Sequence, residues 1–173
     1  MRSGIRGRTA VEMAVRIDLA VEDPAWKKSG VGLRRLRDTA SLALRRGGSD
    51  LPERPELTLL LADDARLQAL NASFRGKDAP TNVLSFPAGT NDRGYLGDVA
   101  VAYGVAAREA AEKGIGLAAH VQHLVVHGVL HLLGYDHVTA AQARIMEPLE
   151  VAVLKELAIS DPYQPRATRP RQT

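Results

Sequence analysis

One short segment near the carboxyl end, residues 127–137 (HGVLHLLGYDH), constrains the fold more than any other part of the chain. Its first two histidines are four residues apart, so on a helix they project from one face, about 6 Å apart along the axis. Gly134 can adopt the left-handed conformation that ends a helix, which would bring His137 back toward His127 and His131. Three neutral imidazoles with an open fourth position are typical of a catalytic zinc site rather than a structural one.

The spacing of these histidines is that of the metzincin proteases, except at one position. Where those enzymes have a glutamate directly after the first histidine, this chain has Gly128. Because that glutamate moves the protons in peptide hydrolysis, a peptidase built on this motif would lack its general base and acid. Phosphodiester cleavage depends less on one fixed carboxylate, since it needs a metal and a cation that stabilises negative charge on the phosphate. The motif therefore favours phosphodiester chemistry.

Arg75 is the candidate for that cation. It lies at the predicted end of a helix, beside Gly76 and Lys77. Its guanidinium can bind a phosphate through two parallel hydrogen bonds, which a lysine cannot do. An arginine at a helix end can equally serve as a favourable partner of the helix dipole. The spacing alone leaves both roles open.

Other polar residues near the motif have two possible roles each. His120 and His123 fall in the same arc of the predicted helix as the first two motif histidines. His120, however, lies about 16 Å along the axis from His131, too far to share its ion. We therefore expect supporting roles for His120 and His123 at least as much as contact with a substrate. Asp136 either orients a metal-bound imidazole or stabilises the turn.

Length and composition indicate one globular domain. The chain has 173 residues, 45% of them hydrophobic, and no cysteine, which excludes a disulfide-linked partner and a thiolate metal site. No apolar run reaches the roughly 18 residues of a membrane span, and no secretory signal is evident, so we expect a cytoplasmic protein without a membrane partner. We predict a flexible basic extension at 1–12, a folded domain at 13–163 and a disordered basic tail at 164–173.

Hydrophobic periodicity predicts an α+β fold, with a small mixed four-stranded sheet packed with about five helices. Apolar alternation or short apolar runs predict strands, and amphipathic spacing predicts helices. The predicted strands are 14–21, 56–62, 82–86 and 96–103, and the predicted helices are 33–46, 64–74, 105–113, 117–133 and 139–157.

Three separated motifs, residues 70–87 (LNASFRGKDAPTNVLSFP), 96–101 (LGDVAV) and 127–137, together resemble the YbeY family of bacterial endoribonucleases. The resemblance implies a single α+β domain with a zincin-like metal-site helix and one Zn²⁺ ion. It implies that His127, His131 and His137 bind the ion and that Arg75 is the family's functional arginine. It also implies action on ribosomal RNA of the small subunit, in maturation of the 16S 3′ end, and a part in ribosome quality control.

Two other classes of function remain open at this point. A zinc peptidase could recruit its base from Glu147 or Glu150. A ribosome-assembly factor could use a purely structural zinc ion and catalyse nothing. The three imidazoles would also suit nickel or copper.

Overall fold

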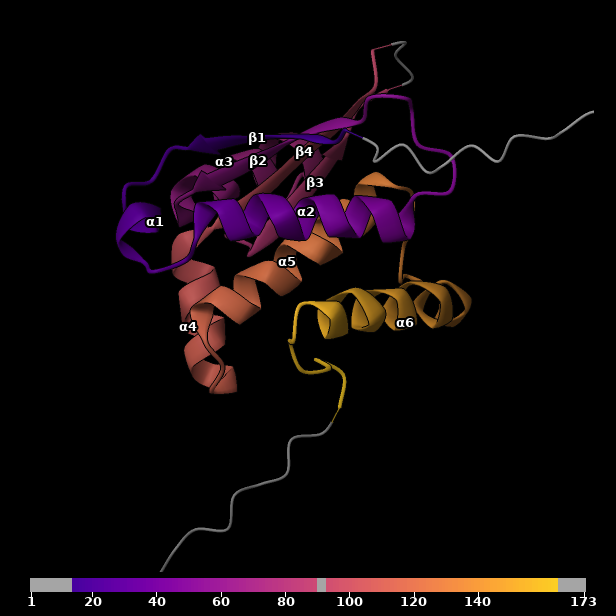
Figure 1. Ribbon diagram of the computed structural model, residues 1–173. Coiled ribbons are helices and arrows are strands. Elements are labelled where there is room, and N and C mark those ends of the chain that lie inside the picture. The colour runs from indigo at the N-terminus through magenta and orange to yellow at the C-terminus, as the bar shows by residue number, and fades with distance from the viewer. Residues whose placement is uncertain (1–13, 90–92, 165–173) are drawn as a thin grey trace, which may run out of the picture.

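The computed structural model describes residues 14–89 and 93–164 (Figure 1). Its sheet has four strands in the order β1-β2-β4-β3. Strands β1, β2 and β4 are parallel, and β3 pairs antiparallel with β4, so the predicted mixed sheet is confirmed. The strands comprise β1 (Arg16–Val21), β2 (Glu56–Ala62), β3 (Val83–Pro87) and β4 (Tyr95–Ala102).

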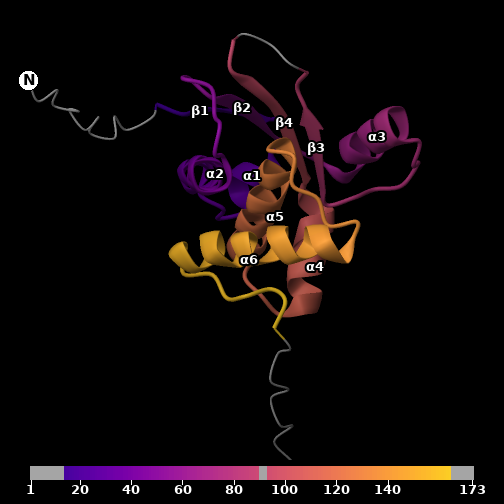
Figure 2. The same ribbon diagram turned by 90° about the vertical axis from the view of Figure 1, so that its right-hand side faces the viewer.

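Six helices surround this sheet in the described part of the chain, one more than the sequence predicted. They are α1 (Ala25–Lys28), α2 (Leu33–Gly47), α3 (Asp64–Arg75), α4 (Tyr103–Lys113), α5 (Leu117–Leu132) and α6 (Ala140–Glu156). The additional helix is α1, which is a single turn and therefore too short to give a periodic hydrophobic pattern. Helices α2 and α5 lie on one side of the sheet, α3 lies beside β3 and β4, and α6 crosses α5 (Figure 2).

The alternation of side chains along β4 separates two apolar clusters. Val99 and Val101 belong to the larger cluster, which includes residues of α2, α5 and α6. Ala100 and Ala102 belong to a smaller cluster, formed with Leu67 of α3. Because successive side chains of a strand point to opposite faces, α3 covers the face of the sheet opposite α5. Helix α5 is buried on most sides, which explains why its sequence is apolar almost all round.

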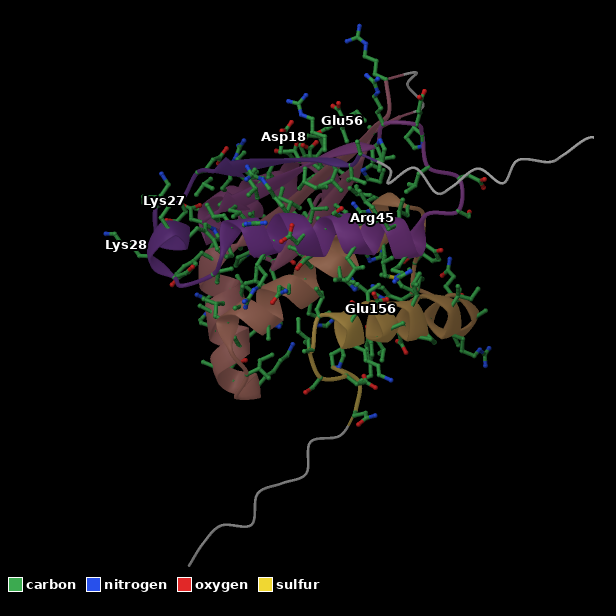
Figure 3. All side chains as sticks on the ribbon, viewed as in Figure 1. Asp18, Lys27, Lys28, Arg45, Glu56 and Glu156 are labelled. Atoms are coloured by element: carbon green, nitrogen blue, oxygen red, sulfur yellow. The ribbon has the colours of Figure 1, made fainter. Side chains whose placement is uncertain are left out.

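Helix α6 is tied to α2 at the molecular surface. Arg46 donates two hydrogen bonds to the Glu156 carboxylate, at 2.7 and 2.9 Å. Arg16 pairs with Asp18 at 3.2 Å and with Glu56 at 3.9 Å. Asp18 and Glu56 lie on the side of the sheet away from α2 (Figure 3). Both groups of charges are exposed, so each adds little to stability.

The segment after α6, residues 157–164, folds back toward α5. It brings the ring of Tyr163 to within 6.4 Å of the ring of His123, measured between centroids. The predicted extension 1–12 and the tail from residue 165 onward lie outside the described residues, so they stay predictions.

No single helix within the described ranges 14–89 and 93–164 is long and apolar enough to cross a membrane. Helices α4 and α5 meet the criteria of length and composition only as a pair, with a bend of 117° between them.

Candidate metal centre

The structure brings the three motif histidines together. Helix α5 places His127 and His131 on one face, with their Nε2 atoms 3.1 Å apart. The helix ends at Leu132, and Gly134, with a φ of 91°, turns the chain so that the His137 ring faces the other two. Its centroid lies 5.0 Å from that of His127 and 5.1 Å from that of His131. One nitrogen from each ring lies within 4.8 Å of the other two, so the three can share one ion.

The remaining ring nitrogens support this assignment. Nδ1 of His131 is 2.9 Å from the Tyr135 carbonyl oxygen, and Nδ1 of His127 is 3.1 Å from Glu150 Oε1. These oxygens can only accept, so both Nδ1 atoms carry protons and both Nε2 atoms present lone pairs. Two imidazole nitrogens bound to one tetrahedral zinc lie about 3.3 Å apart, close to the spacing seen here. The donor set therefore fits a zinc ion.

The environment of His131 keeps its imidazole neutral. Burial lowers the pKa of His131, and the neighbouring His127 lowers it further. Because a metal ligand must be unprotonated, this shift favours metal binding at neutral pH. Metal affinity should fall in acid, where protons compete with the metal for the three imidazoles.

Glu150 of α6 holds the ring of His127 through a hydrogen bond on the side away from the metal-facing nitrogen. Its side chain is fully buried and lies 2.7 Å from His123 Nε2 and 3.1 Å from His127 Nδ1, while its other oxygen accepts a hydrogen bond from the Tyr163 hydroxyl. Burial acts to raise the pKa of Glu150, but the hydrogen bonds from His123 and His127 outweigh it and lower the pKa to about 2. Glu150 is thus an ionised carboxylate that orients His127.

The sequence suggested Glu150 only as a base for a peptidase, and its contacts point to a different role. His123, His127 and Glu150 also lie close enough to hold an ion themselves. We regard this trio as a hydrogen-bonded support, since both histidines already contact the same oxygen of Glu150. A signal for this role was available, because Glu150 stands at helical spacing between the apolar core positions Met146 and Val153. A carboxylate in a core stripe requires buried partners.

His120 belongs to a separate buried network. Its Nε2 lies 2.7 Å from Glu109 Oε2, and Asn82 donates to the same carboxylate at 3.0 and 3.1 Å. Burial lowers the pKa of His120. His120 therefore helps to fix α4 and the start of β3 against α5, and it does not reach the three-histidine group.

A pocket of about 540 Å³ opens over the three imidazoles, and Arg75 contributes to its wall. Arg75 is the last residue of α3, and its Nη2 donates to the Ser85 carbonyl oxygen of β3 at 3.3 Å. The side chain is exposed, and its other donors have no protein partner among the described residues. A guanidinium held by one bond at a pocket rim can use its remaining donors to bind a phosphate group.

Asp136 also lines this pocket, and its contacts distinguish between the two roles considered for it. The backbone N–H of His137 donates to Asp136 Oδ1 at 2.8 Å. Asp136 therefore stabilises the turn that carries His137. No hydrogen bond from Asp136 to an imidazole nitrogen is present in the described structure.

Gly128, at the position of the metzincin glutamate, faces the sheet. A Cβ atom there would lie 2.5 Å from Val99 Cγ1 and 3.3 Å from Val83 Cγ2. The Ser85 hydroxyl also donates to the Gly128 carbonyl oxygen at 2.8 Å. Glycine therefore lets α5 approach β3 and β4 closely, and a glutamate side chain has no space at this position.

We expect Gly128→Ala to destabilise the protein by about 1–3 kcal/mol, because the added methyl group must displace Val99 or move α5. Chemical denaturation of the metal-free protein measures this change. The matched control is Gly116→Ala, since a Cβ atom at Gly116 meets no atom within 4 Å. Equal stability of the two variants would contradict a close-packing role for Gly128.

These observations define a class of site, in which an open metal centre of three imidazoles lies beside an arginine suited to phosphate. Comparison with known proteins assigns the class to a family. The family described as Endoribonuclease YbeY matches residues 26–158. The chain belongs to this family, and its class of activity is therefore that of a hydrolase that cleaves RNA internally.

Individual relatives agree with this assignment. An endoribonuclease YbeY of Maricaulis maris is 43% identical over 149 residues, covering 85% of this chain and 91% of that protein. One from a Chelativorans species is 47% identical over 157 residues, covering 87% of this chain and 94% of that protein. A solution structure of a Thermotoga maritima protein superposes with a TM-score of 0.52 at 25% identity, covering 87% of this chain and 99% of that one.

Proposed function

We propose that the protein is a zinc-dependent endoribonuclease that cleaves single-stranded segments of ribosomal RNA. The proposal includes the small ribosomal subunit as its partner, maturation of the 16S 3′ end and ribosome quality control as its tasks, and the cytoplasm as its location. The observation that carries it is the shared pocket, which is lined both by three histidines that can hold one ion and by Arg75 at the end of α3.

Each group in the pocket has a defined task in this proposal. A zinc ion bound by His127, His131 and His137 would polarise the phosphate and activate a water molecule. Arg75 would bind a non-bridging phosphate oxygen and stabilise the negative charge that develops there. The leaving oxygen would take its proton either from Asp136, which lines the pocket, or from solvent. Lys77 would attract the RNA backbone electrostatically.

The peptidase alternative would need Glu147 or Glu150 as its base. Both oxygens of Glu150 accept hydrogen bonds inside the protein, which ties that carboxylate to an orienting role. Glu147 lines a smaller pocket that adjoins the metal centre through His127 and His137, and this pocket does not include Arg75. The position of Arg75 in the larger pocket favours phosphodiester chemistry. Purified zinc-loaded protein should therefore cleave single-stranded RNA and leave both an RNA duplex and an unstructured peptide intact. Peptide cleavage that disappears in His131→Ala, with the RNA left uncut, would overturn the proposal in favour of a peptidase.

Replacing Arg75 by alanine should lower single-turnover RNA cleavage by about tenfold to a hundredfold, the range for losing a charge-assisted hydrogen bond. Arg75→Lys should recover only part of the loss, because lysine cannot form two parallel bonds. Arg66→Ala removes another exposed arginine of α3, paired with Glu22 at 3.2 Å, and serves as the matched control. If the Arg75 and Arg66 variants cleave equally well, Arg75 has no part in the reaction. Normal RNA processing in cells carrying Arg75→Glu would instead favour a structural zinc.

A further inference from the structure

An exposed aromatic ring lies next to the arginine of the pocket. Phe74 is 69% exposed, an unusual environment for a large apolar side chain. Its ring meets the ring of Phe86 edge to face, with centroids 5.1 Å apart and an interplanar angle of 63°. Phe86 is half-buried and packs against the small apolar cluster beneath α3. The two phenylalanines of the chain are thus in contact: Phe86 supports the pair from the sheet, and Phe74 projects into solvent.

This aromatic pair is continuous with the metal pocket through the edge strand β3. Ser85 and Pro87, the neighbours of Phe86 along the strand, both line the pocket. Phe86 itself points to the opposite face, where α3 lies. Arg75, the residue after Phe74, reaches the edge of β3 and donates to the Ser85 carbonyl oxygen. A strand that leaves the pocket past Arg75 and passes around the edge of β3 would therefore meet Phe74 next.

The charges around Phe74 suit a polyanion. Arg75 and Lys77, one and three residues after Phe74, are both exposed. The nearby acidic side chain, Asp78, accepts a hydrogen bond from Gln68 at 2.8 Å. The acidic residue within α3 itself, Asp64, lies at the opposite end of the helix. The end of α3 and the residues after it thus combine an exposed aromatic ring with two positively charged side chains, as do surfaces that bind single-stranded nucleic acid.

We propose that Phe74, supported by Phe86, is a stacking surface for one unpaired base of the RNA strand whose phosphate lies in the metal pocket. This inference rests on the proposed ribonuclease function and adds a subsite to it. Every base offers a π face, so the contact binds RNA without selecting its sequence. A base paired in a duplex is already stacked on its neighbours, so the surface favours single strands. The area of one exposed ring is close to that of one nucleobase and far smaller than the interface that a protein partner needs.

The test is single-turnover cleavage of a fluorescently labelled single-stranded RNA by the zinc-loaded protein at increasing protein concentration. Phe74→Ala should raise the half-saturating concentration about 5- to 100-fold, the range expected for one stacked base. Phe74→Trp should keep or improve binding, whereas Phe74→Leu, which is apolar but has no ring, should resemble alanine. RNA with an abasic nucleotide at the contacted position should bind equally well to the wild type and to Phe74→Ala.

Two controls distinguish base stacking from a general effect of removing exposed apolar surface and from failure of the ribonuclease proposal. Ile145→Ala removes another exposed apolar side chain, 65% exposed on α6 and outside the pocket walls, and should not change the half-saturating concentration. Unchanged RNA binding by Phe74→Ala, or tight binding by Phe74→Leu, would overturn the stacking inference while leaving the ribonuclease proposal intact. If the wild type neither cleaves the RNA nor changes its fluorescence anisotropy, the proposed function itself fails.

Discussion

His131→Ala is expected to lose both zinc binding and RNA cleavage. Only two imidazoles of the three would remain, and the Nε2 atom that faces His127 at 3.1 Å would be gone. Changes to groups that merely support a ligand lower metal affinity by 10- to 100-fold, so loss of a ligand should cost at least two orders of magnitude. Competition with a chromophoric chelator measures the affinity, and single-stranded RNA measures the activity.

The matched control for His131→Ala is Val138→Ala. Val138 lines the same pocket and is 81% exposed, but it offers no donor atom to a metal. Its replacement should leave zinc affinity unchanged. Circular dichroism of both variants without metal should resemble that of the wild type, because neither side chain is in the core. Full cleavage activity in His131→Ala would mean that the reaction does not use this centre.

Glu150→Ala is expected to weaken both the fold and the metal centre. The substitution removes a buried charge and leaves His123, His127 and Tyr163 without their shared partner. Breaking a buried charged network of this kind costs about 3–5 kcal/mol of the free energy of unfolding. Zinc affinity should also fall about 10- to 100-fold, because His127 loses the contact that fixes its ring. Denaturant titration and chelator competition measure the two effects separately.

Milder substitutions distinguish orientation of His127 from general stability. Tyr163→Phe removes one hydroxyl from a half-exposed ring and leaves Glu150 bonded to both histidines, so it should weaken zinc binding less than Glu150→Ala does. Glu150→Gln keeps the shape of the side chain but removes its charge. If Glu150→Ala binds zinc as tightly as the wild type after correction for unfolded protein, Glu150 does not position His127.

Acid unfolding gives an independent check on Glu150. Its pKa is about 2 in the folded protein, below the usual value of 4.5. A depressed carboxyl pKa stabilises the fold above about pH 4.5, and this contribution is lost as the pH falls toward 2. Without metal, the wild type should therefore lose stability through this window more steeply than Glu150→Gln.

The motif residues were the part of the site that the sequence could predict. Spacing on a helix fixes the relative position of His127 and His131, and Gly134 marks the turn before His137. These are local relations, so no knowledge of the tertiary structure was needed. The four strands and the longer helices were predictable for the same reason, since each has its own apolar run or hydrophobic period. The order and direction of the strands were not predicted, because they depend on contacts between distant segments.

The supporting residues required the fold. Glu150 reaches His127 only because α6 crosses α5, and Tyr163 reaches Glu150 only because the chain turns back after α6. Gly128 looked like the loss of a catalytic glutamate, whereas the structure shows that it permits close packing against Val99. The Phe74 surface likewise depends on which face of β3 is covered by α3. The apolar spacing of α6 marks Glu150 as a buried carboxylate, but a local pattern does not identify partners that lie on distant segments.

In the proposed function, one metal ion held by His127, His131 and His137 is required for RNA cleavage. The most direct measurement is a titration of zinc into chelator-treated wild-type protein while the cleavage of single-stranded RNA is followed. Activity should be absent at the start, rise in proportion to added zinc and saturate at one ion per chain. Full cleavage by the metal-free protein, or zinc binding that leaves cleavage unchanged, would contradict a metal-dependent ribonuclease activity.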